Sequence, residues 1–151
     1  MTDKRRKKST KQEEEFYVAP AELKKMLSEY YEQEDSETIP DELAEAVHKI
    51  AQGLSYNRNF INYSYREDMV GDALVKMIQA VRAKKFKLES GTNPFSYFTT
   101  VAFYEFINRI KKEKRNQEAI QNYQEINYPD LMHEQNSNVY VKSETNVEDE
   151  E

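Results

Sequence analysis

Two consecutive helices are predicted by residues 65–115, which read YREDMVGDALVKMIQAVRAKKFKLESGTNPFSYFTTVAFYEFINRIKKEKR. Within residues 65–84, apolar side chains recur at three- and four-residue spacings and form one wide stripe on a helix: Met69, Val70, Ala73, Leu74, Met77, Ile78 and Val81. Asn93 suits an N-cap and Pro94 the first position of the next helix. The spacing therefore predicts an all-α protein.

The second of these helices carries six aromatic side chains within residues 95–106. So many rings cannot all face one small core, and we expect some to be exposed. Exposed rings flanked by Arg and Lys suit a single-stranded nucleic acid, because bases stack on rings at about 1–3 kcal/mol each while cations hold the backbone. A helix buried on two sides is the alternative interpretation.

The formal charge of −6 is unevenly distributed along the chain. Residues 56–116 carry 12 Lys and Arg against 6 Asp and Glu, whereas residues 117–151 carry one Lys against 9 Asp and Glu. The acidity thus belongs to the C-terminal segment, and the central region is basic. Such asymmetry indicates nucleic-acid contact, although a charge run is more often a solvated face.

Length and composition favour one small domain with disordered ends. We expect a disordered basic arm over residues 1–18, a helical domain over residues 19–116 and an acidic, mostly disordered tail over residues 117–151. The absence of Cys excludes disulfides, thiolate metal sites and a Cys nucleophile. The sequence has neither a membrane-spanning run nor a secretion signal, so no membrane contact is expected.

Two further helices are predicted upstream. Pro20 suits the first position of one, and Pro40 opens the other. Their apolar faces carry Leu23, Met26, Leu27, Tyr30 and Tyr31 in the first, and Leu43, Val47, Ile50 and Leu54 in the second. Residues 55–64 lack a strict period and are interpreted as a connection that packs Phe60 and Ile61 inward.

The helix pair resembles conserved region 2 of bacterial sigma factors. The residues that carry the resemblance are 68–81 (DMVGDALVKMIQAV), Phe86 and 93–102 (NPFSYFTTVA). More narrowly, the chain resembles the late-promoter sigma factors of T-even-type bacteriophages, through Gly53-Leu54, Asn59-Phe60, Asn93-Pro94 and residues 106–115 (FINRIKKEKR). The resemblance covers roughly residues 40–116 and implies a region 2 type fold in the cytoplasm of an infected bacterial host.

For polymerase binding, the resemblance implies that the polar face of the first helix docks on a coiled coil of the bacterial RNA polymerase core. By position this role falls to Asp68, Asp72 and Lys76, with Gly71 standing where many sigma factors have Gln. From spacing alone, Asp68 and Asp72 either complement the helix dipole or form an acidic docking spot for a basic partner.

For promoter DNA, the resemblance implies that the loop and second helix read the non-template strand of a short AT-rich, −10-like element. The implied contacts are Tyr97, Phe98, Thr99, Thr100, Tyr104, Glu105 and Asn108, with Arg109, Lys111 and Lys112 on phosphates. The paired Trp that housekeeping sigma factors use to open the duplex are here Val101 and Ala102. We hypothesise that Tyr97 and Phe98 supply the wedge instead, because an inserted ring recovers much of the cost of unstacking.

The chain has no room for a helix-turn-helix, so the resemblance also implies a DNA sliding clamp and a late coactivator as further partners. Phage late sigma factors grip the clamp through a short hydrophobic, acidic C-terminal motif. The C-terminal residues here are acidic without a terminal aromatic. Residues 128–132 (YPDLM) and 139–141 (VYV) are the alternative anchors.

Catalysis finds little support in the sequence, and neither a cofactor nor a catalytic residue is expected. His48 and His133 lie far apart, and three Gly provide no phosphate loop. A metal-dependent nuclease using Glu67, Asp68 and Asp72 is a minor alternative. The main alternative is a non-catalytic helical adaptor that clasps another protein; its binding would barely depend on salt, whereas DNA binding would weaken steeply.

Overall fold

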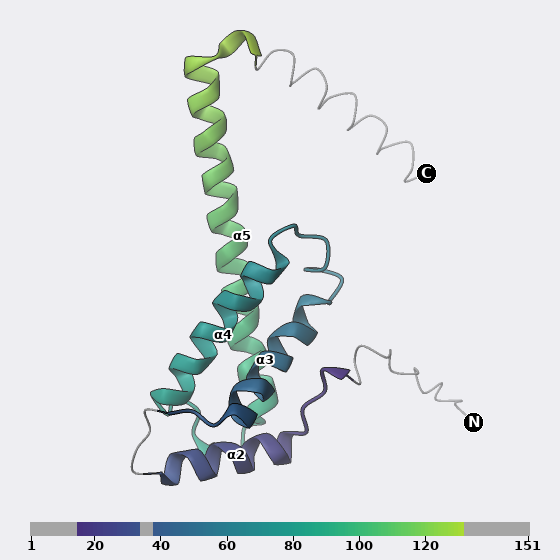
Figure 1. The fold of residues 1–151 in the computed structure, drawn as a ribbon, viewed down its shortest axis with the longest axis vertical. Helices are drawn as coiled ribbons and strands as arrows, with labels where there is room; N and C mark the ends of the chain where they lie inside the picture. Colours follow the sequence, from purple (N-terminus) through teal and green to yellow (C-terminus); the bar gives the residue numbers. More distant parts are fainter. Residues whose placement is uncertain (1–14, 34–37, 132–151) are drawn as a thin grey trace, which may run out of the picture. The chain divides into compact units, whose positions relative to one another are not determined.

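The computed structural model of this chain describes residues 15–33 and 38–131 (Figure 1). The helices in this part are α2 (Pro20–Glu32), α3 (Asp41–Ser55), α4 (Arg66–Arg82) and α5 (Pro94–Asn127), with the 3-10 turn η1 (Leu88–Ser90) before α5. No strand occurs among the described residues, so the all-α prediction is confirmed. The chain divides into two compact units, Met1–Arg109 and Ile110–Glu151.

Local signals set the helix starts as predicted. Pro20 and Pro94 are the first residues of α2 and α5, where the missing N–H of proline costs no helical hydrogen bond. Pro40 immediately precedes α3. The Asn93 side-chain Oδ1 accepts a hydrogen bond of 2.9 Å from the Phe95 backbone N–H, which confirms the N-cap.

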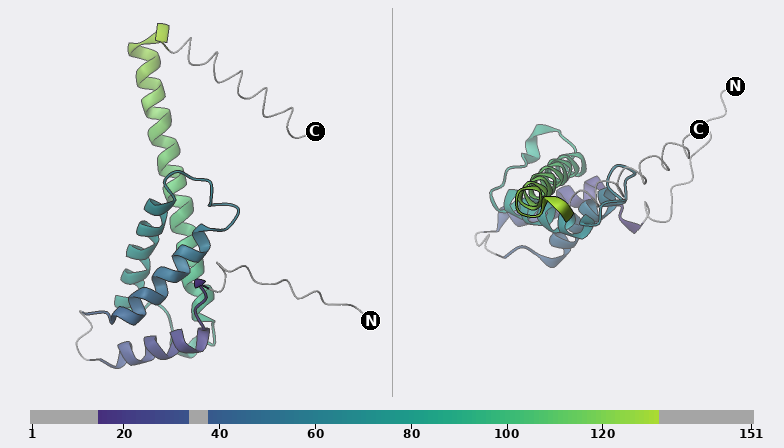
Figure 2. Two further views of the ribbon diagram at one scale, coloured as in Figure 1. Left: turned by 45° about the vertical axis from the view of Figure 1, so that its right-hand side comes forward. Right: turned by 90° about the horizontal axis from the view of Figure 1, so that it is seen from above.

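The core of the first unit lies between α2, α3, α4 and the first part of α5. α2 runs across the end of the unit where α3 begins and α4 ends (Figures 1 and 2). The large side chains that are fully enclosed come from all four helices: Leu23, Leu27, Tyr30, Leu43, Val47, Met69, Met77, Val81, Phe98 and Phe106. The predicted apolar faces of these helices are therefore the faces that pack together.

The segment after α4 is tied to α2 by two polar contacts. The Tyr31 hydroxyl donates to the Phe86 carbonyl at 3.1 Å, and the Lys84 ammonium donates to the Tyr31 carbonyl at 3.2 Å. Burial raises the pKa of the Tyr31 hydroxyl above its usual value, with smaller contributions from Tyr97 and Tyr30. Tyr31 therefore stays a hydrogen-bond donor throughout the neutral pH range.

The predicted arm boundary at residue 18 is wrong. The Phe16 ring stacks on Tyr56 with centroids 5.4 Å apart, and Val18 is buried. Gly53 permits this approach, because a Cβ there would lie 3.0 Å from the Phe16 Cβ. Burying one ring and one aliphatic side chain offsets the ordering entropy of these residues. The remainder of the predicted arm, residues 1–14, lies outside the described residues.

The predicted start of a disordered tail at residue 117 is also wrong, because α5 continues to Asn127. No Gly or Pro interrupts the chain between Pro94 and Pro129, and Glu, Gln and Ala favour the helix. The units divide after Arg109 rather than after residue 116. Residues 132–151, which include the candidate anchor at residues 139–141, lie outside the described residues.

The connection between α3 and α4 is only partly as expected. Phe60 is buried, with its ring edge-on to Phe106 at 5.1 Å and to Phe103 at 5.7 Å, but Ile61 is exposed. Hydrogen-bonded turns over these residues, in which Phe60 and Ile61 both donate to the Asn57 carbonyl, send the two neighbouring side chains in different directions. Within residues 15–33 and 38–131, no helix is both long and apolar enough to cross a membrane.

Candidate functional site

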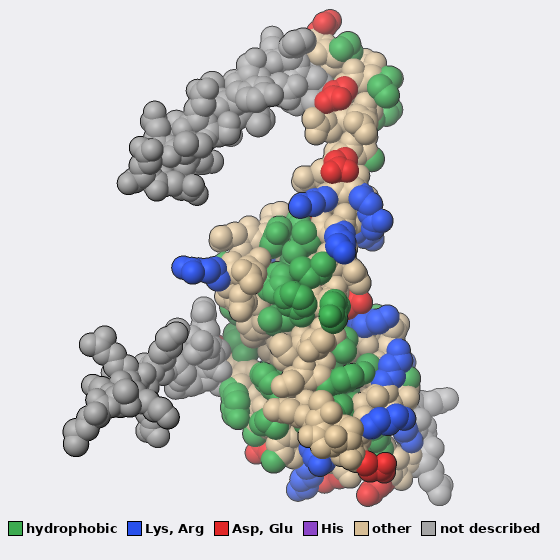
Figure 3. Space-filling model, turned by 180° about the vertical axis from the view of Figure 1, so that it is seen from behind, with side chains coloured by type: hydrophobic (Ala, Val, Ile, Leu, Met, Phe, Trp, Pro, Cys, Tyr) green, Lys and Arg blue, Asp and Glu red, His purple; other side chains and the backbone are tan. Residues whose placement is uncertain are grey.

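The aromatic side chains of α5 divide between the core and the surface, which confirms that some are exposed. Phe98 and Phe106 are fully buried, whereas Phe103 is 40% and Tyr104 63% exposed. The Phe103 and Tyr104 rings meet edge to face with centroids 5.9 Å apart. Figure 3 shows hydrophobic side chains gathered on one face of the molecule. We call Phe103 and Tyr104 the exposed ring pair.

Phe98, predicted to contact DNA, is buried in the core of the first unit. Phe98 has no solvent exposure, and its ring packs against Tyr97 at 5.2 Å and Phe86 at 6.4 Å. Phe98, Ala102 and Phe106 recur every four residues and are all buried, so they form the inner face of α5. Tyr97 is half-buried. Burial of Phe98 argues against its part in the wedge hypothesis, and the exposed ring pair is the more accessible candidate.

The other predicted DNA contacts of the first unit lie at different depths. Thr99 and Glu105 are half-buried, whereas Thr100 and Asn108 are exposed. The Thr99 and Thr100 hydroxyls donate to backbone carbonyls one turn earlier, at 2.8 and 2.9 Å. Thr100, Tyr104 and Asn108 are spaced four residues apart, so they share one exposed face of α5.

The predicted polymerase-binding residues lie along α4. Asp68, Gly71 and Lys76 are exposed, and so is Val75, which the sequence did not single out. A Cβ added at Gly71 would meet no atom within 4 Å, so there is free space beside the helix at this position. Asp68, Gly71 and Val75 follow the spacing of one helix face, with an apolar side chain among polar ones. We call these three residues the α4 strip.

Asp72 and Arg109, predicted for two different surfaces, bind each other. The Arg109 Nε donates to one Asp72 carboxylate oxygen at 2.6 Å, and Nη2 donates to the other at 3.0 Å. The side chains are 37% exposed at Asp72 and 20% at Arg109. Neither residue is simply available for the predicted role, because each satisfies the other's charge. No local spacing signals a pair 37 residues apart.

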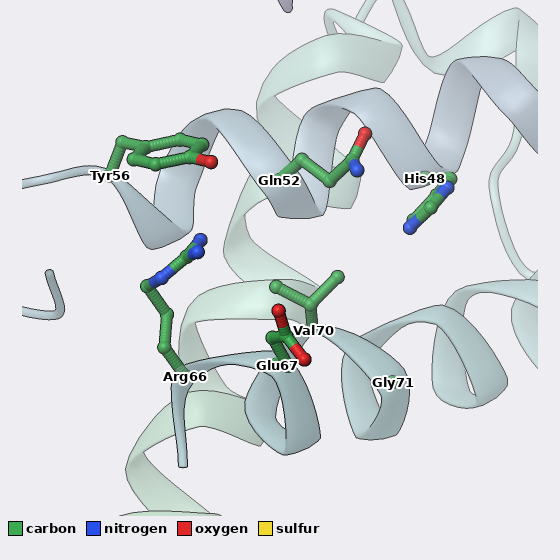
Figure 4. Close-up of a pocket in the computed structure, with 7 residues that line it drawn as sticks. All are labelled: His48, Gln52, Tyr56, Arg66, Glu67, Val70 and Gly71. Carbon is green, nitrogen blue, oxygen red and sulfur yellow. The ribbon is translucent and has the colours of Figure 1, made fainter. Parts of the chain in front are cut away.

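A cavity of about 330 Å³ lies beside the α4 strip, between α3 and α4. Figure 4 shows its lining residues, with Arg66 reaching toward Tyr56. The Arg66 guanidinium lies 4.4 Å from the centre of the Tyr56 ring, and its Nη1 donates to the buried Ser55 hydroxyl at 2.8 Å. The cavity is lined by His48, Gln52, Tyr56, Arg66, Glu67, Val70 and Gly71.

Sequence reasoning missed this cavity, because its walls come from two helices. The only local signal is the polar character of His48, Gln52 and Glu67 on helices with strong apolar faces. His48 is half-buried where it lines the cavity.

The remaining predicted phosphate contacts, Lys111 and Lys112, belong to the second unit, where both are exposed on α5. In that unit α5 also exposes Ile120, Tyr123 and Ile126.

Across the described part of the chain, no three His, Cys, Asp or Glu side chains are grouped so as to hold a metal ion. No protein-family model, curated protein or solved structure matches the chain.

Proposed function

We propose that this protein is a sigma-type specificity factor of the phage late-promoter kind. In this proposal it binds a bacterial RNA polymerase core in the infected cell and directs it to a short AT-rich promoter element, which it helps to open. The observation that carries the proposal is the exposed ring pair on α5. Tyr104 of this pair shares one exposed helix face with Thr100 and Asn108. Rings that remain partly exposed are suited to stacking on unpaired bases.

In the same proposal, the α4 strip docks on the polymerase. Asp68 provides a charge for a basic partner, and Val75 provides apolar area that the first unit leaves exposed. The strip and the exposed ring pair lie on different helices of the first unit, so one domain can contact polymerase and DNA with separate side chains. A sliding clamp and a late coactivator are further proposed partners.

The first test is whether Asp68→Lys abolishes co-elution of the full chain with bacterial RNA polymerase core. We expect apparent affinity to fall by more than about tenfold, because the change replaces an attractive charge with a repulsive one. Asp68 is preferred to Asp72, whose substitution also breaks the ion pair with Arg109. The control is Lys111→Gln with Lys112→Gln, which should spare co-elution and weaken DNA binding.

Failure of the unaltered chain to co-elute with any plausible host core contradicts the proposal. The adaptor function then takes its place, with the apolar side chains of the second unit as its binding surface. Salt dependence separates the two functions, since each phosphate contact contributes about 0.7–0.9 log units of affinity per log unit of salt.

A second prediction concerns Gly71→Gln. The Gln side chain has room at this position, and we expect the helix to gain about 0.5–1 kcal/mol of stability from loss of Gly. We also expect polymerase binding to tighten by about two- to tenfold, the value of one new hydrogen bond. Competition binding against wild type measures this, with Gly71→Ala as the matched control. Weaker binding by Gly71→Gln alone contradicts the predicted contact and indicates that a partner side chain occupies the space.

A further inference from the structure

The cavity between α3 and α4 contains polar side chains without a partner in the described part of the chain. The His48 ring, the Gln52 amide and the Glu67 carboxylate line it, and none of them makes a hydrogen bond or ion pair with a described residue. The buried Val70 forms an apolar wall beside Glu67 (Figure 4). A carboxylate next to an apolar wall suits a Lys side chain, whose alkyl stem covers apolar surface while its ammonium donates to an acceptor.

Arg66, the cation among the lining residues, is already engaged. Its guanidinium lies 4.4 Å from the centre of the Tyr56 ring and donates to the Ser55 hydroxyl at 2.8 Å. Glu67 follows directly in the sequence, but its charge is not neutralised by Arg66. The cavity therefore offers an open negative charge to an incoming cation.

The N-terminal segment enters the fold at the edge of this cavity. His48, Gln52 and Tyr56 are spaced four residues apart, so they share the face of α3 that lines the cavity. The Phe16 ring stacks on Tyr56 with centroids 5.4 Å apart. The chain that precedes Phe16 therefore begins beside the lining residues.

The segment that begins there has the opposite charge. Residues 1–14, which lie outside the described residues, carry six Lys and Arg against three Asp and Glu, with five consecutive basic residues at 4–8. An extended chain spans about 3.3–3.6 Å for each residue, so Lys11 can reach about 14 Å from Glu15. A short flexible tether provides an effective concentration on the order of mM, so even a weak ion pair is populated within one chain.

We propose that the basic segment of residues 4–11 occupies the α3–α4 cavity of its own chain. A Lys ammonium of this segment binds the Glu67 carboxylate, and its stem packs against Val70. Gly71 lines the cavity and also belongs to the α4 strip, so a partner that binds the strip competes with the segment. The inference does not depend on the proposed sigma function.

The test uses the full chain in solution. The chain lacks Cys, so Ser9→Cys provides a single attachment site for a nitroxide spin label. We expect the label to broaden the backbone amide NMR signals of His48, Gln52 and Gly71, compared with the same sample after the nitroxide is reduced. The spectrum of the reduced sample also shows whether each variant is folded.

A matched pair of variants tests the contact with Glu67. Glu67→Gln should weaken the broadening at His48 and Gly71 about two- to fivefold, the factor expected from removing one exposed ion pair. Asp68→Asn is the control, because it removes the same charge from the same helical turn at a residue that does not line the cavity. It should leave most of the broadening in place.

A third variant separates the cavity from its charge. Gly71→Leu leaves every charge in place and narrows the cavity, because a Cβ at this position has free space to extend into. This variant should also weaken the broadening at His48. A mixture of spin-labelled chain with unlabelled, nitrogen-15-enriched chain should show none, because the proposed contact lies within one chain.

Three results would each overturn the proposal. One is the absence of broadening at the lining residues. Another is an equal loss in Glu67→Gln and Asp68→Asn, which indicates a general attraction to the acidic start of α4. The third is broadening in the mixed sample, which assigns the cavity to the basic segment of a second copy. None of these results bears on co-elution with polymerase, so failure here is distinct from failure of the proposed function.

Discussion

Phe98→Ala is expected to lower the free energy of unfolding by about 3–5 kcal/mol, the usual cost of removing a buried ring and leaving a cavity. Phe98 has no solvent exposure and packs against Tyr97 and Phe86. A domain of this size is typically stable by only about 5–15 kcal/mol, so the loss is a large share of the total.

Urea denaturation followed by far-ultraviolet circular dichroism measures the effect. The matched control is Phe103→Ala, which removes the same ring from the same helix at a position 40% exposed and should cost much less. Phe98→Leu retains most of the apolar volume and should leave DNA binding unchanged, because the ring contacts only protein. Equal costs at positions 98 and 103 contradict the core placement of Phe98.

Loss of the exposed ring pair, by Phe103→Ala with Tyr104→Ala, is expected to abolish most promoter opening. Each lost base–ring stack costs about 1–3 kcal/mol, or roughly 5- to 150-fold in the opening equilibrium for each ring. Permanganate reactivity of promoter thymines, in the presence of polymerase core, measures the open state. Polymerase co-elution should remain normal, because the α4 strip is unaltered.

Tyr123→Ala is the matched control for this second prediction. Tyr123 is 60% exposed, close to the 63% of Tyr104, and lies on the same helix but in the second unit. Its loss should leave thymine reactivity unchanged. Unchanged reactivity in the Phe103 and Tyr104 double variant contradicts the assignment of the wedge to this pair.

The sequence shows how many rings the start of α5 carries, but it does not show which of them are exposed. The density of rings over residues 95–106 correctly predicted that some are exposed. Which rings are exposed depends on the rotation of α5 against the other helices, and that rotation buries positions 98, 102 and 106. Two of the predicted surface residues, Asp72 and Arg109, are likewise partners of each other.

The helices could be predicted from the sequence because the signals that define them are local. Apolar spacing of three and four residues identified α2, α3 and α4, and Asn93 with Pro94 marked the start of α5. The sequence did not predict three features: the stacking of Phe16 on Tyr56, the cavity beside Gly71 and the Asp72–Arg109 pair. Each joins segments tens of residues apart, and such contacts depend on how whole helices pack rather than on the propensity of any one segment.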